Sequence, residues 1–141
     1  ADAPGVVREN FFAVDGSRGA HVQLNNVKLS KEQILGEADH GLPLVETVID
    51  TAIVALGGEA LGAMQVLLDA TVEYTKTRKQ FGQPIGGFQA VSHRMADMRV
   101  RLENARLLLY KTAWKMDQGE SVRLESSMLK LAISEDFLAS A

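Results

Sequence analysis

The 141-residue sequence contains no cysteine, and only three histidines and three prolines. Without cysteine there is no disulfide framework, zinc finger, iron–sulfur cluster or thiol nucleophile. Lysine and arginine (15) are slightly outnumbered by aspartate and glutamate (18), so the net charge is -3. Proteins that bind nucleic acid or anionic membranes usually have a basic surplus, and we expect neither kind of partner here.

Long apolar runs are also scarce. No window approaches the roughly 18 apolar residues of a membrane span, and the start shows no signal-peptide pattern. Hydrophobic residues make up 46% and charged residues 23%, the balance of a folded domain. We therefore expect a cytoplasmic protein of single-domain size.

Residues 1–35 have the composition of β structure. Strand-forming residues occur before Asp15–Gly16, a turn signal, and the run 20–24 after it alternates apolar and polar residues. That alternation is typical of a strand with one buried face. The sequence predicts a β-hairpin, and because an isolated hairpin is marginal in water, we expect it to pack against something else.

Beyond residue 41 the apolar residues take the spacing of helices. One long helix is predicted from about Leu44 to about Thr77, where a segment rich in glycine interrupts it. A second helix, ended by Gly119, has apolar residues at intervals of three and four. Its inward stripe comprises Phe88, Val91, Met95, Met98, Leu102, Ala105, Leu109, Ala113 and Met116.

A third helix is predicted from near Ser121 to the end, with Leu124, Met128, Leu131 and Leu138 facing inward. Long amphipathic helices joined by short connections favour an antiparallel up-down bundle. The predicted fold class is therefore mainly α, a helical bundle preceded by a short β-hairpin. In the first helix, Gly57–Gly58 costs about 1 kcal/mol per residue relative to alanine, which indicates tight helix packing, a local kink or a surface for a ligand.

No self-sufficient active site is evident. The sequence has no P-loop, no glycine fingerprint after a strand and no nucleophile elbow. His93 and Asp97 stand four residues apart, but a polar surface pair is a better interpretation than a shared metal. We predict no catalytic residue and no metal site.

The unusual segment runs from Thr77 to Gln89, at the end of the first long helix. In one interpretation Arg78 and Lys79 offset the helix dipole and Phe81 fills the corner. In the other, the segment binds an anion and a flat ring. Arg78 would then pair with a phosphate, Phe81 would cover an aromatic face, and Gln80 and Gln89 would bind polar groups.

Residues 77–98, TRKQFGQPIGGFQAVSHRMADM, strongly resemble the signature region of the acyl-CoA dehydrogenases. These flavoproteins remove two hydrogens from the α and β carbons of an acyl-CoA thioester. Residues 1–36 resemble the end of the family's middle β domain, and residues 37–141 resemble the first three helices of its C-terminal helical domain. Residues 1–6 and 69–83 are also similar to the small-subunit group of pimeloyl-CoA dehydrogenases.

The resemblance implies a site for FAD. It implies that Arg78 contacts the diphosphate of an FAD bound by a neighbouring subunit and that Gln80 and Phe81 line the same dinucleotide. Phe88 and Gln89 match a further contact pair. A cofactor shared between subunits implies a homo-oligomer, a dimer or tetramer, or a sister subunit, and an acyl-CoA substrate in the complete protein.

The sequence departs from the family at the catalytic base. Most family members carry this carboxylate in a segment that has no counterpart here, and a minority carry a glutamate at the position matching Ala52. Alanine cannot remove a proton, and the following position, often arginine, is Ile53. Glu46 and Glu59 lie on the same helix without matching the base, and Glu59 is predicted to be at least half-buried with a partner.

Two functional hypotheses follow. In the first, the chain is a fragment of an FAD-dependent acyl-CoA dehydrogenase that contributes FAD contacts and oligomer packing and does not oxidise acyl-CoA alone. In the second, the chain is a non-catalytic helical oligomerisation module or partner subunit of the same family.

Overall fold

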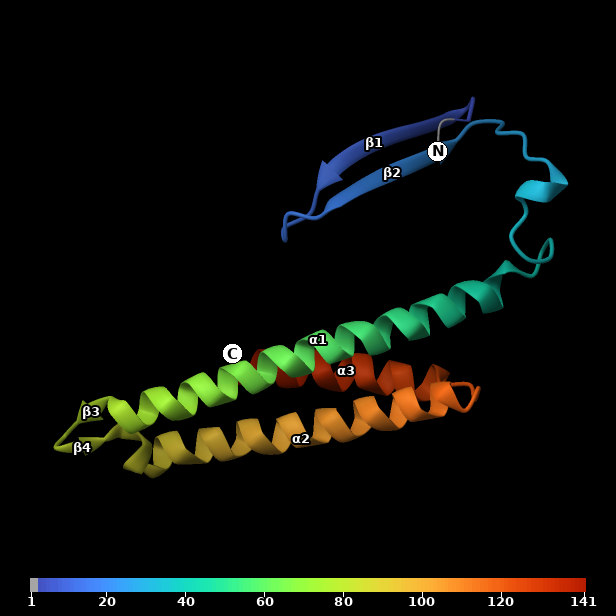
Figure 1. Ribbon diagram of the computed structural model, residues 1–141. Helices are drawn as coiled ribbons and strands as arrows, with labels where there is room; N and C mark the ends of the chain where they lie inside the picture. The colour runs from blue at the N-terminus through green and yellow to red at the C-terminus, as the bar shows by residue number, and fades with distance from the viewer. Residues whose placement is uncertain (1–2) are drawn as a thin grey trace. The chain divides into compact units, whose positions relative to one another are not determined.

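The computed structural model describes residues 3–141, which divide into two units, one that ends at Gly41 and one that comprises Leu42–Ala141. The elements run β1, β2, a 3-10 turn, α1, β3, β4, a second 3-10 turn, α2 and α3 (Figure 1).

The first unit contains the predicted hairpin. Strand β1 (Val6–Phe12) pairs antiparallel with β2 (Arg18–Leu24). The predicted turn between them is confirmed, because a side-chain oxygen of Asp15 accepts the amide N–H of Ser17 at 2.9 Å and Gly16 has a φ of +80°. The expectation of one buried face was wrong for this unit, where Val22 and Leu24 are 56% and 68% exposed. A two-stranded hairpin has no second layer to cover either face.

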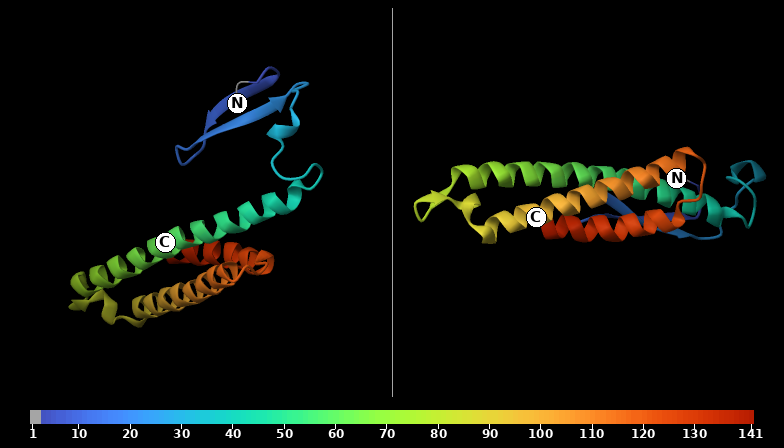
Figure 2. Two further views of the ribbon diagram at one scale, coloured as in Figure 1. Left: turned by 45° about the vertical axis from the view of Figure 1, so that its right-hand side comes forward. Right: turned by 90° about the horizontal axis from the view of Figure 1, so that it is seen from below.

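The second unit is a bundle of three long helices that run side by side (Figures 1 and 2). Helix α1 spans Gly41–Thr77, α2 spans Gln89–Asp117 and α3 spans Arg123–Ser140. Gly119 ends α2 as predicted, since its φ of +74° is one that glycine adopts without strain and its N–H donates to the carbonyl of Met116 at 2.9 Å. The mainly α fold class with its preceding hairpin is confirmed.

The core lies where all three helices meet. Leu102 and Leu129 are completely buried, and the stripe predicted for α2 is confirmed at its centre. Gly57 belongs to this core: a Cβ placed there would lie 3.2 Å from side-chain carbons of both Leu109 and Leu129. Close helix packing thus accounts for Gly57. The buried hydrophobic cluster is Leu61, Met64, Leu68, Met98, Leu102, Ala105, Leu109, Leu129 and Ile133.

The predicted inward face of α3 was wrong. Leu124, Met128, Leu131 and Leu138 are between 48% and 76% exposed. The face that packs on the bundle instead carries Leu129 and Ile133, together with the fully buried Ser126. A serine stands among the core residues because its hydroxyl donates to Asp50 Oδ1 on α1 at 2.6 Å, which satisfies both buried polar groups.

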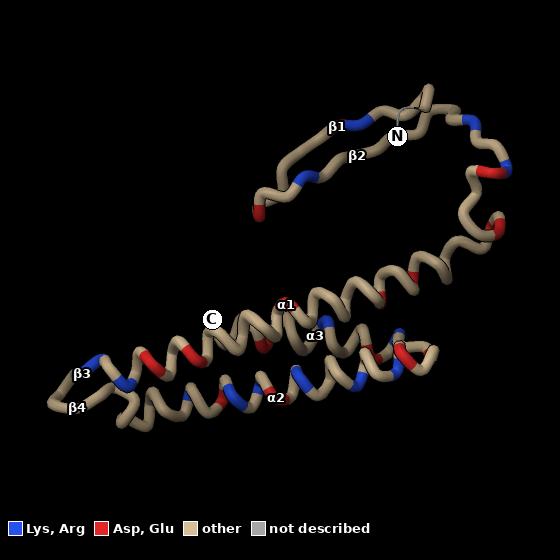
Figure 3. The backbone as a smooth tube through the Cα atoms, in the orientation of Figure 1, with Lys and Arg blue, Asp and Glu red and all other residues tan. Residues whose placement is uncertain are grey.

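Helix α1 also corrects the expectation about apolar runs. It contains a window with a mean hydropathy of 1.6, long and apolar enough by composition to cross a membrane, and 22% of that window is buried. Small and branched apolar residues give this window its high hydropathy. Charged residues are sparse along α1 and frequent along α2 (Figure 3). One such helix is weak evidence for a membrane span, because helices of packed bundles have the same composition.

Candidate functional site

Arg78 stands where α1 ends. Its N–H donates to the carbonyl of Tyr74 at 2.9 Å, as in a last helical turn, and its own carbonyl accepts the N–H of Ile85 at 2.9 Å. The chain therefore leaves the helix and returns to the same residue within a few positions. The Arg78 side chain is exposed and has no carboxylate partner among residues 3–141, so its guanidinium is available to an external anion.

Between these two points lies a two-residue hairpin. Strand β3 (Lys79–Gln80) pairs with β4 (Gln83–Pro84), leaving Phe81 and Gly82 as the turn. Both turn residues have positive φ, +52° and +82°, as in the type I′ turn that suits tight hairpins. Glycine adopts this conformation freely, whereas a phenylalanine there is strained.

The strained turn exposes the Phe81 ring to solvent. Phe81 is 92% exposed, so the interpretation that it fills a corner of the fold was wrong. Among residues 3–141 its one ring contact is edge-to-face with Phe88, at 6.1 Å between centroids and 90° between planes. Strained, exposed aromatic residues are more typical of binding sites than of packing.

The remaining predicted residues lie beside this turn. Gln80 precedes Phe81 and is exposed; Phe88 is half-buried at the start of α2, and Gln89 is the first residue of that helix and exposed. All five predicted residues thus gather in one segment at the β3–β4 end of the bundle (Figure 1). Together they offer one cation, two amides and two aromatic rings.

Close contacts of Thr75, near the end of α1, support the β3–β4 hairpin. Thr75 is 4% exposed, and its hydroxyl donates to the carbonyl of Val72 at 2.9 Å and contacts Met95 Sδ at 3.2 Å. A Cβ on Gly86 would lie 3.2 Å from the carbonyl oxygen of Thr75, so the segment entering α2 sits directly on the end of α1. Sequence reasoning missed Thr75, since a threonine near a helix end is unremarkable without its partners.

Ala52 is the residue that the resemblance matches to the family's catalytic base. Ala52 is exposed, while the carboxylates nearest in sequence face α3: Asp50 binds Ser126, and Glu46 lies 3.6 Å from Arg123. Glu59 was expected to be at least half-buried with a partner; instead it is exposed and unpaired among residues 3–141. It occupies the outer side of α1, next to Gly58.

A metal site is not found either. Across residues 3–141, no group of three or more histidine, aspartate or glutamate side chains is placed to hold an ion. His93 and Asp97 are both exposed and, within that range, do not bond to each other, which corrects their interpretation as a polar pair. At the far end of α2, a hydrogen bond to Glu125 raises the pKa of Lys115.

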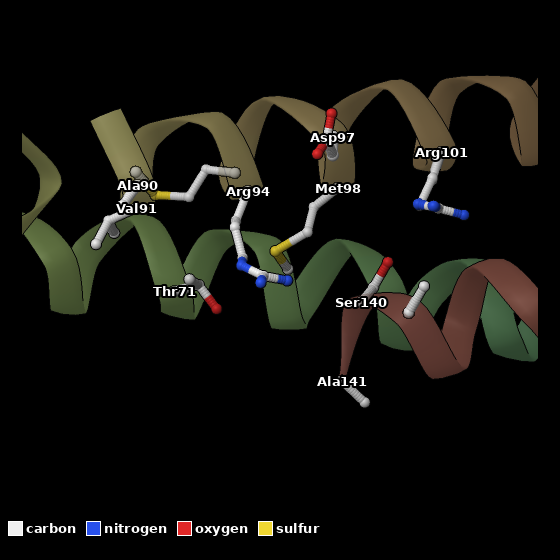
Figure 4. A pocket seen from close by; sticks show the side chains of 11 residues that line it. Thr71, Ala90, Val91, Arg94, Asp97, Met98, Arg101, Ser140 and Ala141 are labelled. Carbon is white, nitrogen blue, oxygen red and sulfur yellow. The ribbon is translucent and has the colours of Figure 1, made fainter. Parts of the chain in front are cut away.

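A concave region elsewhere on the bundle was not anticipated from the sequence. It is an open cavity of about 640 Å³ lined by α2, by Thr71 of α1 and by the end of α3. Arg94, Met98 and Arg101 extend into it from α2 toward the other two helices (Figure 4). Because Arg101 is held 2.7 Å from Asp136, its charge is largely satisfied within the chain.

The fold and site define a helical domain that carries an exposed cation and aromatic ring on a short hairpin. Residues 39–141 match the family model of the acyl-CoA dehydrogenase C-terminal domain. The chain belongs to the acyl-CoA dehydrogenase family.

Individual relatives agree with this assignment. The chain is 47% identical over 107 residues to L-prolyl-[peptidyl-carrier protein] dehydrogenase from Pseudomonas fluorescens, covering 76% of this chain and 28% of the relative. It is 37% identical over 127 residues to 3-(aryl)acrylate reductase from Clostridium sporogenes, covering 90% and 34%.

Solved structures show the same fold. The structure of PigA with FAD and proline superposes with a TM-score of 0.91 at 34% identity, covering 99% of this chain and 37% of that one. Butyryl-CoA dehydrogenase from Megasphaera elsdenii gives 0.81 at 30% identity, covering 96% and 36%. The chain therefore spans about a third of the length of these relatives.

Proposed function

We propose that this chain is part of an FAD-dependent oxidoreductase that acts on an acyl thioester, and that its hairpin segment binds FAD. The observation that carries this proposal is the exposed side chain of Arg78, which has no carboxylate partner among residues 3–141, three positions before the exposed ring of Phe81. Support also comes from the structure of PigA, which contains FAD.

The residues present fit a flavin dinucleotide. A planar guanidinium pairs in two-pronged fashion with phosphate oxygens, and the FAD diphosphate supplies them. Phe81 offers a flat apolar face for a ring, while the amides of Gln80 and Gln89 are exposed for polar groups at the edge. All of these groups are exposed within residues 78–89, so we infer that another part of the protein, or another subunit, covers the second side of the FAD.

FAD, when bound, would supply the hydride acceptor for the β carbon of the substrate. The role we propose for this chain is to hold the dinucleotide, with Arg78 on the diphosphate and Phe81 over a ring. Because Ala52 cannot remove the α proton, we propose that the base lies outside residues 1–141. The substrate would be an acyl thioester of coenzyme A or of a carrier protein, the latter suggested by the prolyl-carrier dehydrogenase.

Titration of FAD into the 141-residue chain, followed by flavin fluorescence, tests the proposal. We expect binding in the micromolar range. Arg78→Ala should weaken it about 10- to 100-fold, because a hydrogen bond to a charged group contributes about 1.5–3 kcal/mol. Lys79→Ala is the matched control: this neighbouring cation is exposed in β3, and its loss should change the affinity less than threefold. Absence of binding by the wild-type chain, or equal effects of the two variants, would overturn the proposal.

A second function, a non-catalytic partner subunit, is favoured by one observation. Ala52 and Ile53 replace functional residues of the family, and both carboxylates near them are engaged with α3. Under either function we expect the chain alone to give no acyl-CoA-dependent dye reduction. Assembly with an FAD-containing protein without FAD binding by this chain itself would favour the partner-subunit function.

A further inference from the structure

The buried stripe of α1 ends in a polar residue. Leu61 and Leu68 belong to the core, and Thr75 lies seven residues further along, on the same side of the helix. Thr75 is 4% exposed, and among residues 70–77, all of which the structure describes, it alone is buried. Burying a hydroxyl costs free energy that valine, of nearly the same shape, would avoid. The hydroxyl at this position therefore needs an explanation beyond packing.

That hydroxyl brings α1 and α2 close together. Its O–H donates to the carbonyl of Val72 at 2.9 Å, and its oxygen lies 3.2 Å from Met95 Sδ on α2. A carbon atom approaches a carbonyl oxygen only to about 3.3–3.6 Å and another carbon to about 3.5–4.0 Å. A methyl group does not fit at the position of the hydroxyl, so valine would push Met95 away from the last turns of α1.

The segment between β4 and α2 packs on the same threonine. It forms a 3-10 turn, Ile85–Gly87, and a Cβ on Gly86 would lie 3.2 Å from the carbonyl oxygen of Thr75 and 3.3 Å from its hydroxyl oxygen. Ile85, the first residue of that turn, donates its N–H to the Arg78 carbonyl at 2.9 Å. Thr75 thus lies in the helix that enters the hairpin and contacts both elements that follow it.

We propose that Thr75 is a positioning residue for the FAD-binding segment, an inference that rests on the proposed function. The groups of this segment come from different elements: Arg78 follows the end of α1, whereas Phe88 and Gln89 lie at the start of α2. A dinucleotide that contacts both ends needs a fixed distance between them, since preorganised groups bind without the cost of being ordered. The Thr75 hydroxyl sets that distance by holding α2, through Met95, closer to α1 than valine would allow.

Two substitutions of Thr75 separate the hydroxyl from its packing. Thr75→Val keeps the shape and removes the hydroxyl, whereas Thr75→Ser keeps the hydroxyl and removes a buried methyl group. Because each loses one buried interaction, we expect each to lower the Tm by about 4–8 °C. Thr112→Val is the matched control: Thr112 is 0% exposed, and its hydroxyl donates to the Leu108 carbonyl at 2.7 Å within α2, away from the hairpin.

Titration of FAD into the 141-residue chain, below the melting transition of every variant, gives the affinity by flavin fluorescence. We expect Thr75→Val to weaken binding about fivefold to tenfold, the loss that one neutral hydrogen bond represents. Thr75→Ser and Thr112→Val should each change the affinity by less than about twofold. A purely structural role would make the affinity follow the Tm, so the three variants would behave alike. Equal effects of the two Thr75 variants, or of Thr75→Val and Thr112→Val, would overturn the proposal.

Amide hydrogen exchange reports the same geometry without FAD. The Ile85 N–H, bonded to the Arg78 carbonyl, reports the base of the hairpin. The Ser126 N–H, bonded to the Val122 carbonyl at 2.7 Å, reports the other end of the bundle. In Thr75→Val the Ile85 amide should exchange about fivefold faster than in the wild type and the Ser126 amide at an unchanged rate, whereas Thr75→Ser should leave both unchanged.

The exchange measurement distinguishes failure of this inference from failure of the proposed function. If the wild-type chain binds no FAD, the proposed function fails, while faster exchange at Ile85 in Thr75→Val still assigns Thr75 to positioning the hairpin. Unchanged exchange at Ile85 in Thr75→Val would overturn that assignment whatever the FAD result.

Discussion

The two adjacent glycines of α1 allow a prediction in which packing is separated from helix propensity. Gly57 points into the core, where a Cβ would meet Leu109 and Leu129 at 3.2 Å; at Gly58 a Cβ would meet nothing within 4 Å. Both residues lie in the interior of the same helix. Replacing each by alanine therefore gives the same gain in propensity, about 1 kcal/mol, and differs only in packing.

The packing difference can be estimated from the neighbours. Leu129 is completely buried and Leu109 is 5% exposed, so neither side chain can move aside without disturbing the core. Overpacking of this kind costs about 1–3 kcal/mol. We expect Gly58→Ala to stabilise the chain by about 1 kcal/mol, whereas Gly57→Ala should be neutral or destabilise it by up to about 2 kcal/mol.

Thermal unfolding followed by circular dichroism measures both variants. For a domain of this size, about 1 kcal/mol corresponds to roughly 4–8 °C in Tm. Gly58→Ala should therefore melt above the wild type and Gly57→Ala at or below it. Equal increases in Tm for the two variants would refute the close packing of Gly57 and with it the observed contact between α1, α2 and α3.

Three further predictions concern other parts of the chain. Ser126→Ala should destabilise the chain by about 1–3 kcal/mol in urea unfolding, because Asp50 stays buried without its 2.6 Å partner, whereas Ser127→Ala on the exposed face should have little effect. The hydrogen bond from Lys115 lowers the pKa of Glu125 below its ordinary 4.5, so this pair stabilises the fold above pH 4.5 and its contribution is lost as the pH falls through the lowered pKa. Lys115→Met should abolish this part of the acid sensitivity, and an unchanged pH profile of unfolding in this variant would contradict the prediction. Phe81→Asn should raise stability by about 0.5–1 kcal/mol, since asparagine adopts positive φ readily, and should weaken FAD binding; tighter FAD binding by this variant would contradict the role of the ring.

The helices could be predicted from sequence where one apolar face was clear. In α2 the inward residues Met98, Leu102, Ala105 and Leu109 are buried as their spacing predicted. Helix α3 carries apolar residues on two faces, and the buried face includes Ser126, which hydropathy counts as polar. Its burial depends on Asp50, 76 residues earlier, and such a long-range partner leaves no local signal.

The candidate site was partly predictable for a simple reason: its residues are close in sequence. Adjacency placed Arg78, Gln80 and Phe81 in one segment before any fold was known. The exposure of Phe81 was not predictable from hydropathy, which favours burial of a large ring. The signal was Gly82, because a glycine in a two-residue connection permits the turn that directs the ring outward.

The hydrogen bond between the Arg78 carbonyl and the Ile85 N–H separates the hairpin from the bundle. Since the chain departs from and returns to one fixed point, residues between them can change in kind, or even in number, without moving either helix. A scaffold built in this way can exchange its recognition tip and keep its frame. Loop grafting at residues 79–84 is thus a natural starting point for redesigning what this end of the molecule binds.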